Sequence, residues 1–153
     1  LPFAFASHFA PDMLLTALEI YRERFQPSQH LDRPHVMVGV MGTAADTDAK
    51  ATHLFTSMQQ SFVRLRRGTP DAFPPPVASM DGLWSEQERI MVEHTLQYAV
   101  VGGLETIRRR IADFLALTRA DELIVSMPIY DMDARLKSVR LFAEARNGLQ
   151  EAA

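Results

Sequence analysis

Short apolar runs alternate with longer stretches of helical periodicity along the chain, and this alternation limits the fold more than any other feature. The first run covers residues 2–9 and the second covers 35–40, whose unbroken apolar character is typical of a parallel strand covered on both sides. A brief run at 99–101 and a clear one at 122–128 follow. Because a helical stretch comes after each run, the sequence predicts parallel β/α units, four in number.

The helical stretches carry recognisable start and stop signals. The pair Pro11–Asp12 opens the first helix, and Pro27 ends it. Asp46 is expected to cap the second helix, which Gly68 stops. A capping box over Ser85–Glu88 opens the third, and two more helices follow the later strands. The buried stripes are expected to be Leu14, Leu18, Tyr21 and Phe25, then Ala51, Leu54, Phe55, Met58, Phe62 and Leu65, then Ile107, Ile111, Phe114 and Leu115, and last Leu136, Val139 and Phe142.

A length of 153 residues with 47% hydrophobic residues predicts one domain with a single core. We place this domain at residues 1–147 and expect the polar tail at 148–153 to fray. The Pro-rich, aperiodic segment 69–84 is expected to be a lid, an excursion across the surface or a mobile loop.

Charge and composition exclude several classes of protein. The 16 basic residues are balanced by 19 acidic ones, for a net charge of -3, and no basic stripe of a nucleic-acid binder is present. With no cysteine, disulfides, thiolate metal sites and cysteine nucleophiles are excluded. No apolar stretch approaches the ~18 residues of a membrane span, and the start lacks the basic region of a signal peptide. We therefore expect a cytoplasmic protein with neither nucleic-acid nor membrane partners.

Ligands of parallel β/α folds gather at the carboxyl ends of the strands. This rule selects four segments, at 7–9, 41–43, 102–103 and 127–131. The first is the most informative, because Ala4, Ala6 and His8 share one face of the predicted strand. Phe3 and Phe5 lie on the other face, which is expected to pack against covering helices. Small side chains leave space in front of a histidine that can donate, accept or take a proton. The alternative, a His8 satisfied by a neighbouring backbone carbonyl, is equally consistent with the sequence.

The other selected segments give weaker signals. Gly102–Gly103 precedes a helix and offers backbone N–H groups to an anion, although a tight turn is the favoured interpretation. Tyr130 follows the last strand as a candidate ligand contact, while Asp131 or Asp133 is expected to cap the last helix.

Histidines and arginines elsewhere in the chain indicate no further site. The remaining histidines form no spaced ligand set with carboxylates, so no metal site is predicted; they are His30, His35, His53 and His94. The arginine clusters at 64–67 and 108–110 are interpreted as solvated helix faces.

Five segments together resemble the luciferase-like flavin-dependent monooxygenases. They are LPFAFASHFAP at the start, YRERFQPS, HVMVGV leading into AADTD, AVVGGLETI, and ADELIVSMPIYD. The resemblance runs in order over essentially the whole chain. It departs from the family pattern at Leu104, where proline is common, and at 41–43, where apolar residues are commoner.

The resemblance implies an α/β fold made of the last four β/α units of a (β/α)8 TIM-type barrel, that is, its C-terminal half. It further implies an oxidoreductase that uses reduced FMN, supplied by a separate flavin reductase, and dioxygen to oxidise a small organic substrate. By resemblance, Ser7 and His8 contact the flavin, His8 is the catalytic residue, and Tyr130 contacts the substrate. Much of the flavin-binding machinery of the family precedes the position of Leu1, so the chain alone is expected to be inactive.

Two alternatives stay open beside this interpretation. One is a deazaflavin-dependent reductase or dehydrogenase of the same superfamily, and the other is a non-catalytic subunit that completes a barrel. In each case the first and last strands of a half barrel would expose unpaired edges. We therefore expect either a homo-oligomer or a missing N-terminal half.

Overall fold

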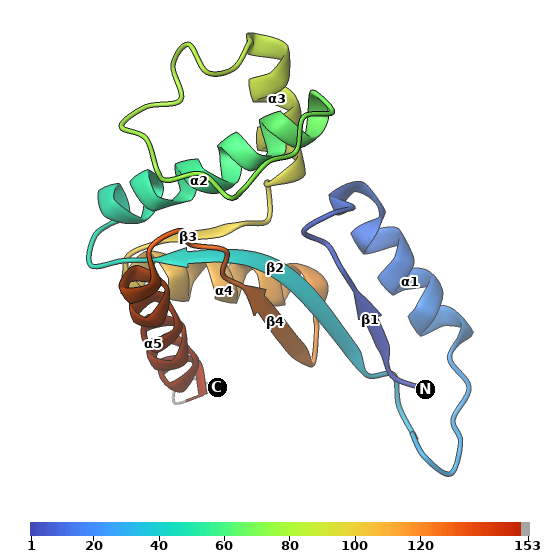
Figure 1. Ribbon diagram of the computed structural model, residues 1–153. Helices are drawn as coiled ribbons and strands as arrows, with labels where there is room; N and C mark the ends of the chain where they lie inside the picture. Colours follow the sequence, from blue (N-terminus) through green and yellow to red (C-terminus); the bar gives the residue numbers. More distant parts are fainter. Residues whose placement is uncertain (151–153) are drawn as a thin grey trace.

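A computed structural model describes the chain over residues 1–150, with side chains up to Gly148. Parallel strands alternate with helices as the sequence predicts, in an α/β fold (Figure 1). The elements in chain order are β1 (Phe3–Phe5), the 3₁₀-helix η1 (Pro11–Met13), α1 (Leu14–Arg24), β2 (Val36–Ala44), α2 (Asp48–Arg66), α3 (Glu86–Thr95), β3 (Val100–Gly102), α4 (Leu104–Thr118), β4 (Glu122–Ser126) and α5 (Met132–Gln150). No helix within residues 1–150 combines the length and apolarity needed to cross a membrane.

The long strand β2 organises an open parallel sheet. Both β1 and β4 pair with it, through Phe3↔Val36 and through Met37↔Glu122 onward, and β3 pairs with its last three residues. The registers of β1 and β4 overlap along β2, so these two strands lie on opposite edges of it. In consecutive barrel units each strand would pair with the next, but here β4 pairs with β2 directly. The three-residue β3 is too short to separate them.

One face of the sheet packs against helices and forms the main core. Val36, Val38 and Val40 alternate along β2 and are almost fully buried on this face. Phe3 and Phe5 of β1 pack on the same cluster, which confirms the predicted orientation of that strand. The helices contribute Leu14, Leu18, Ile107, Ile111, Phe114, Phe142 and Ala145.

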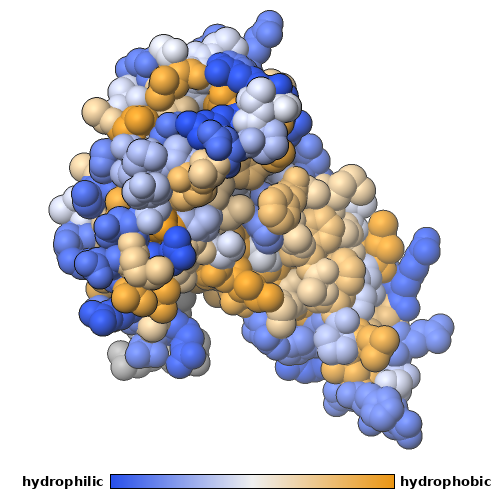
Figure 2. Space-filling view, viewed as in Figure 1, coloured by the Kyte–Doolittle hydropathy of each residue, from blue (hydrophilic) through white to orange (hydrophobic). Residues whose placement is uncertain are grey.

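The opposite face of the sheet is apolar and poorly covered along β1, β4 and the first part of β2, and we call this region the open face. Register and alternation place Ala4, Met37, Gly39 and Ile124 on it. Ala4 is exposed, and Ile124 remains 53% exposed in the middle of β4. Figure 2 shows apolar residues gathered on the side of the molecule where Figure 1 draws β1 and η1. Apolar surface of this kind normally marks a site of binding or association.

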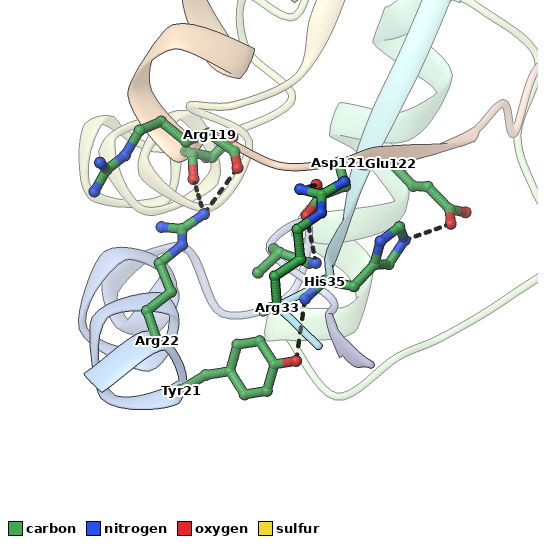
Figure 3. Close-up of polar contacts among 9 residues, drawn as sticks. Tyr21, Arg22, Arg33, His35, Arg119, Asp121 and Glu122 are labelled. Carbon is green, nitrogen blue, oxygen red and sulfur yellow. Dashed lines mark hydrogen bonds and ion pairs between the residues drawn. The ribbon is translucent and has the colours of Figure 1, made fainter. Parts of the chain in front are cut away.

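Polar contacts close the amino ends of the strands (Figure 3). The Asp121 carboxylate accepts a hydrogen bond from the Val36 backbone at 2.8 Å, and the Tyr21 hydroxyl accepts one from the backbone of His35 at 3.2 Å. The His35 ring lies 2.7 Å from a carboxylate oxygen of Glu122. These contacts join β2, β4 and α1 at the end of the sheet remote from the expected ligand site.

Arg22 of α1 secures the carboxyl end of α4, as Figure 3 also shows. Its guanidinium donates to the backbone oxygens of Thr118 and Arg119 at 2.6 and 2.9 Å. These are carbonyls that a helix leaves without an internal partner at its end. Arg119 then leaves the helix in a left-handed conformation with φ +49°.

The Pro-rich segment 69–84 crosses the surface of α2 and is fixed to it at several points. The Thr56 hydroxyl accepts from the backbone N–H of Val77 at 2.9 Å, and Gln60 donates to the carbonyl of Pro75 at 2.9 Å. Met80 is buried against the apolar side of α2 and α3. Of the three expectations for this segment, the excursion across the surface matches the structure.

The arginine cluster at 64–67 is substantially exposed, as the sequence predicts, and its side chains also make contacts within the chain. Arg64 donates to the Ala72 carbonyl at 3.3 Å, and Arg66 reaches the Thr95 hydroxyl at 3.4 Å. Arg67 makes two contacts with the Glu88 carboxylate, at 2.6 and 2.9 Å. The cluster therefore ties segment 69–84 and α3 to α2.

Helix ends follow the predicted signals with one correction. The capping box over Ser85–Glu88 and the stop at Gly68, with φ +71°, are both confirmed. The cap of α2 is Thr47, whose hydroxyl accepts from the Lys50 backbone at 3.2 Å, so the prediction of Asp46 was wrong. Asp46 instead pairs with Lys137 of α5. The predicted tail overlaps the end of α5, and its part at 151–153 lies outside the described residues.

Candidate functional site

The turn that follows β1 is anchored on β2 by Ser7. Its side chain is fully buried, and its hydroxyl donates to the carbonyl oxygen of Gly39 at 2.5 Å. The turn itself is closed by a backbone hydrogen bond from Phe9 to Ala6 at 3.0 Å. The carboxyl end of β1 is therefore held in one position against the middle of β2.

The neighbouring His8 places its imidazole over the same residue of β2. A methyl group built on Gly39 would lie 2.9 Å from Nδ1 and 3.0 Å from Cε1 of the ring, inside normal contact distance. Nδ1 is buried and has no hydrogen-bond partner within the described chain. The interpretation that a backbone carbonyl satisfies His8 is thus wrong for this nitrogen. A buried polar atom without a partner is unusual in a folded protein and calls for an explanation.

The four other histidines are all engaged. Three of them contact an oxygen. His35 contacts the Glu122 carboxylate, His53 the Val77 carbonyl at 3.0 Å, and His94 the Asp12 carboxylate at 2.7 Å. His30 lies 3.1 Å from the side-chain nitrogen of Gln29. Among the described residues no group of three or more potential ligands is placed to hold a metal ion.

The backbone N–H of Gly103, after β3, is hydrogen-bonded within the chain and is not free to bind an external anion. The Asp48 carboxylate accepts from the Gly103 backbone at 2.6 Å and from the Thr106 hydroxyl at 2.9 Å. These hydrogen bonds, the one from Gly103 first, lower the pKa of Asp48 below its ordinary value. A carboxylate from α2 thus occupies the amino end of α4, where an anion would bind.

Tyr130 lies apart from the first two candidates. It follows β4, which flanks the opposite edge of β2 from β1, and its side chain is half exposed. The next residue, Asp131, accepts from the Ala134 backbone at 2.8 Å and caps α5, as one of the sequence interpretations proposed. The structure therefore brings together Ser7, His8 and Gly39, with Tyr130 separated from them by a strand.

Gly39 is the member of this group that sequence reasoning did not single out. A glycine inside an apolar strand often marks a close approach of another group, and Gly39 interrupts the run HVMVGV. That pattern indicates a close contact without naming the partner. The partner is His8, which lies 31 positions earlier in the chain.

Two depressions on the surface of the described residues lie away from His8. One of about 190 Å³ is lined by Tyr98, Val100 and Phe114, and one of about 500 Å³ by Phe3, Tyr21 and neighbours in α1. His8 instead borders the open face. A ligand placed there would have the sheet as one wall and would need a second wall from elsewhere.

The fold and the site together define a parallel α/β domain with the His8 imidazole at the carboxyl end of a strand, on the border of the open face. Comparison with known proteins shows which proteins the chain is similar to. The chain is 46% identical over 149 residues to a luciferase-like monooxygenase of Escherichia coli K12, covering 97% of this chain and 44% of that protein. It is also 46% identical over 144 residues to the uncharacterised protein YvbT of Bacillus subtilis. The chain is thus similar to proteins named luciferase-like monooxygenase, and it spans about 44% of the length of the Escherichia coli relative.

Two solved structures are also similar to the chain. The crystal structure of apo-MsnO8 superposes with a TM-score of 0.85 at 30% identity, over 96% of this chain and 45% of the other. Monooxygenase RslO1 from Streptomyces bottropensis, at 17% identity and a TM-score of 0.52, supports the fold. A scan against family models finds no match.

Proposed function

We propose that this chain is part of a flavin-dependent monooxygenase that uses reduced FMN and dioxygen to oxidise a small organic substrate. The observation that carries the proposal is the position of the His8 imidazole at the carboxyl end of β1, packed on Gly39 and beside the small, exposed Ala4 and Ala6. The similarity to proteins named monooxygenase supports the kind of reaction. When bound, the flavin would supply the reducing electrons and the atom that reacts with dioxygen.

The residues present fit a flat aromatic ligand on the open face. Ala4 and Ala6 are exposed and small, so the surface beside His8 is low and a planar ring can approach the sheet. His8 would serve as a hydrogen-bond partner and proton donor at the edge of that ligand. Tyr130 at the end of β4 remains our proposal for a substrate contact.

The helix ends that follow β3 and β4 are poorly suited to bind the phosphate of FMN. The amino ends of α4 and α5 carry the chain's own Asp48 and Asp131. A carboxylate in that position repels a second anion. We therefore infer that the phosphate is held by residues outside this chain, and that the chain alone does not turn over substrate.

A second polypeptide segment is expected to cover the open face. The exposed apolar side chain of Ile124 and the unpaired edges of β1 and β4 are features that barrel closure normally removes. We propose that a second copy or further sequence of a longer protein provides this cover. A flavin reductase is the proposed source of reduced FMN, and the cytoplasm is the proposed compartment.

The cofactor can be identified by anaerobic titration calorimetry. Purified protein is titrated with reduced FMN and, separately, with reduced deazaflavin, and each mixture is then exposed to dioxygen and substrate candidates. We expect saturable binding of reduced FMN and no saturable binding of the reduced deazaflavin. Preferential binding of the deazaflavin would favour the reductase or dehydrogenase alternative. Failure to bind either cofactor, by protein in a defined oligomer, would favour the non-catalytic subunit.

A further inference from the structure

The side chains of Ser7 and His8 both contact Gly39 of β2. The carbonyl oxygen of Gly39 accepts the Ser7 hydroxyl at 2.5 Å, and the missing side chain of Gly39 leaves the space that the His8 ring fills. The backbone of Ala6 also passes close by, with its Cα 3.8 Å from the position of a Gly39 methyl group. One residue thus receives both an anchor and an imidazole.

The geometry points to Gly39 and Ser7 as positioning residues, which together fix the His8 imidazole at the carboxyl end of β1. Ser7 sets the path of the turn, because its buried hydroxyl is bonded to β2 immediately before His8. Gly39 allows the His8 ring to pack directly on the backbone of β2, because any larger side chain would occupy the volume of Nδ1 and Cε1. Neither residue has to touch a ligand to do this.

This arrangement also separates the two nitrogens of the ring. Nδ1 points at β2 and is buried without a partner, so it is shielded from solvent. We infer that Nε2, on the side of the ring away from Gly39, is the nitrogen that meets a ligand. The part of the inference that concerns ligand contact rests on the proposed function, whereas the packing of His8 on Gly39 does not.

A double-mutant cycle in the absence of cofactor tests the packing. Gly39→Ala in the otherwise unchanged chain is expected to raise the unfolding equilibrium constant at least about fivefold, because the methyl group overpacks against the ring. In a His8→Ala background the same substitution is expected to change that constant less than about twofold, because the clash is gone. Equal effects in both backgrounds would overturn the inference.

Gly42→Ala provides a matched control on the same strand. Its methyl group would meet Val125 and Phe142 in the main core, where Phe142 lies 2.7 Å away. Its cost is therefore expected to be the same with and without His8. Where this variant or Gly39→Ala does not fold, the Ser7 variant described next carries the test.

Ser7→Ala examines the anchor with a spectroscopic readout. Imidazole ¹H–¹⁵N spectra of the unligated protein report the tautomer and environment of each histidine. Loss of the Ser7 hydroxyl is expected to shift the His8 ring signals while leaving those of His53 on α2 in place. Unchanged His8 signals would contradict the positioning role of Ser7.

Binding of reduced FMN separates this inference from the proposed function. If the cycle shows coupling and Gly39→Ala also weakens binding about threefold or more, both stand, since one lost hydrogen bond has about that effect. Coupling without any effect on binding would leave the positioning of His8 intact and overturn its assignment to the flavin site.

Discussion

The carboxylate of Asp48 in α2 binds the backbone of Gly103 at the amino end of α4, with 2.6 Å between oxygen and nitrogen. The contact joins α2 to the start of α4 through two residues that lie 55 positions apart in the sequence, and it fixes the end of β3. It also accounts for Gly102, since a side chain there would collide with Thr106 and with Asp48 itself. The glycine pair thus serves a bond within the chain, where an external anion was one sequence interpretation.

Replacing Asp48 tests this contact through the pH dependence of stability. Because the folded-state pKa of Asp48 lies below its ordinary value of 3.8, its contribution to stability is present above about that pH and is lost as the pH falls through the folded value. Asp48→Asn is expected to lower the unfolding free energy at neutral pH and to reduce its further decrease as the pH falls. Asp48→Ala is expected to lower the unfolding free energy more. Urea unfolding from pH 7 to pH 2 measures both effects.

Glu88 gives a second acid-sensitive contact, at the start of α3. The Arg67 guanidinium first, and then the Ser85 backbone, lower the pKa of the Glu88 carboxyl to about 2 from 4.5. Its contribution is therefore complete above pH 4.5 and is lost as the pH falls toward 2. In Glu88→Gln we expect the unfolding midpoint to fall less between these pH values than in the unchanged chain. If the unfolding midpoints of the two proteins change equally with pH, the ion pair contributes nothing to stability.

Segment 69–84 owes its fixed path to a small number of hydrogen bonds, of which the one at Thr56 is the most buried. Thr56→Val keeps the shape of the side chain and leaves the backbone N–H of Val77 without its acceptor. The expected cost is about 1–3 kcal/mol of unfolding free energy, together with faster hydrogen exchange at Val77. Thr69→Val, which removes an exposed 3.5 Å contact, is the control and is expected to have little effect. Unchanged exchange at Val77 would contradict this account of the segment.

Much of the fold follows from local patterns that a single sequence contains. The apolar run at 35–40 predicts β2, and the alternation of Phe3 and Phe5 with Ala4 predicts which face of β1 meets the helices. The capping box at Ser85 is equally local. These features depend on residues a few positions apart, and the structure confirms them.

The relationships that sequence reasoning missed join distant positions. The pairing of β4 with β2 depends on the shortness of β3, and the cap of α4 comes from Asp48 in another helix. The role of Gly39 depends on where the ring of His8 lies. Periodicity carries no information about such partners, because each is chosen by tertiary packing.

Ile124 tests whether the open face is covered in the assembled protein. Ile124→Asp is expected to raise the dissociation constant of the assembly at least about tenfold, because a carboxylate would be buried without a partner. The control is Ile90→Asp on α3, since Ile90 is equally exposed, at 54% against 53%. Sedimentation velocity measures both variants. A monomer of 17.2 kDa that is unaffected by either substitution would contradict cover of the open face by a second copy.

The central claim, that His8 faces a reduced flavin, is tested most directly by the affinity of the assembled protein for reduced FMN. Anaerobic calorimetry on the unchanged protein and on His8→Ala, at equal association state, gives the two dissociation constants. Saturable binding that weakens about three- to tenfold in His8→Ala, with the fold retained, is the predicted result. Equal affinity for the two proteins, or no saturable binding to the unchanged one, would contradict the claim.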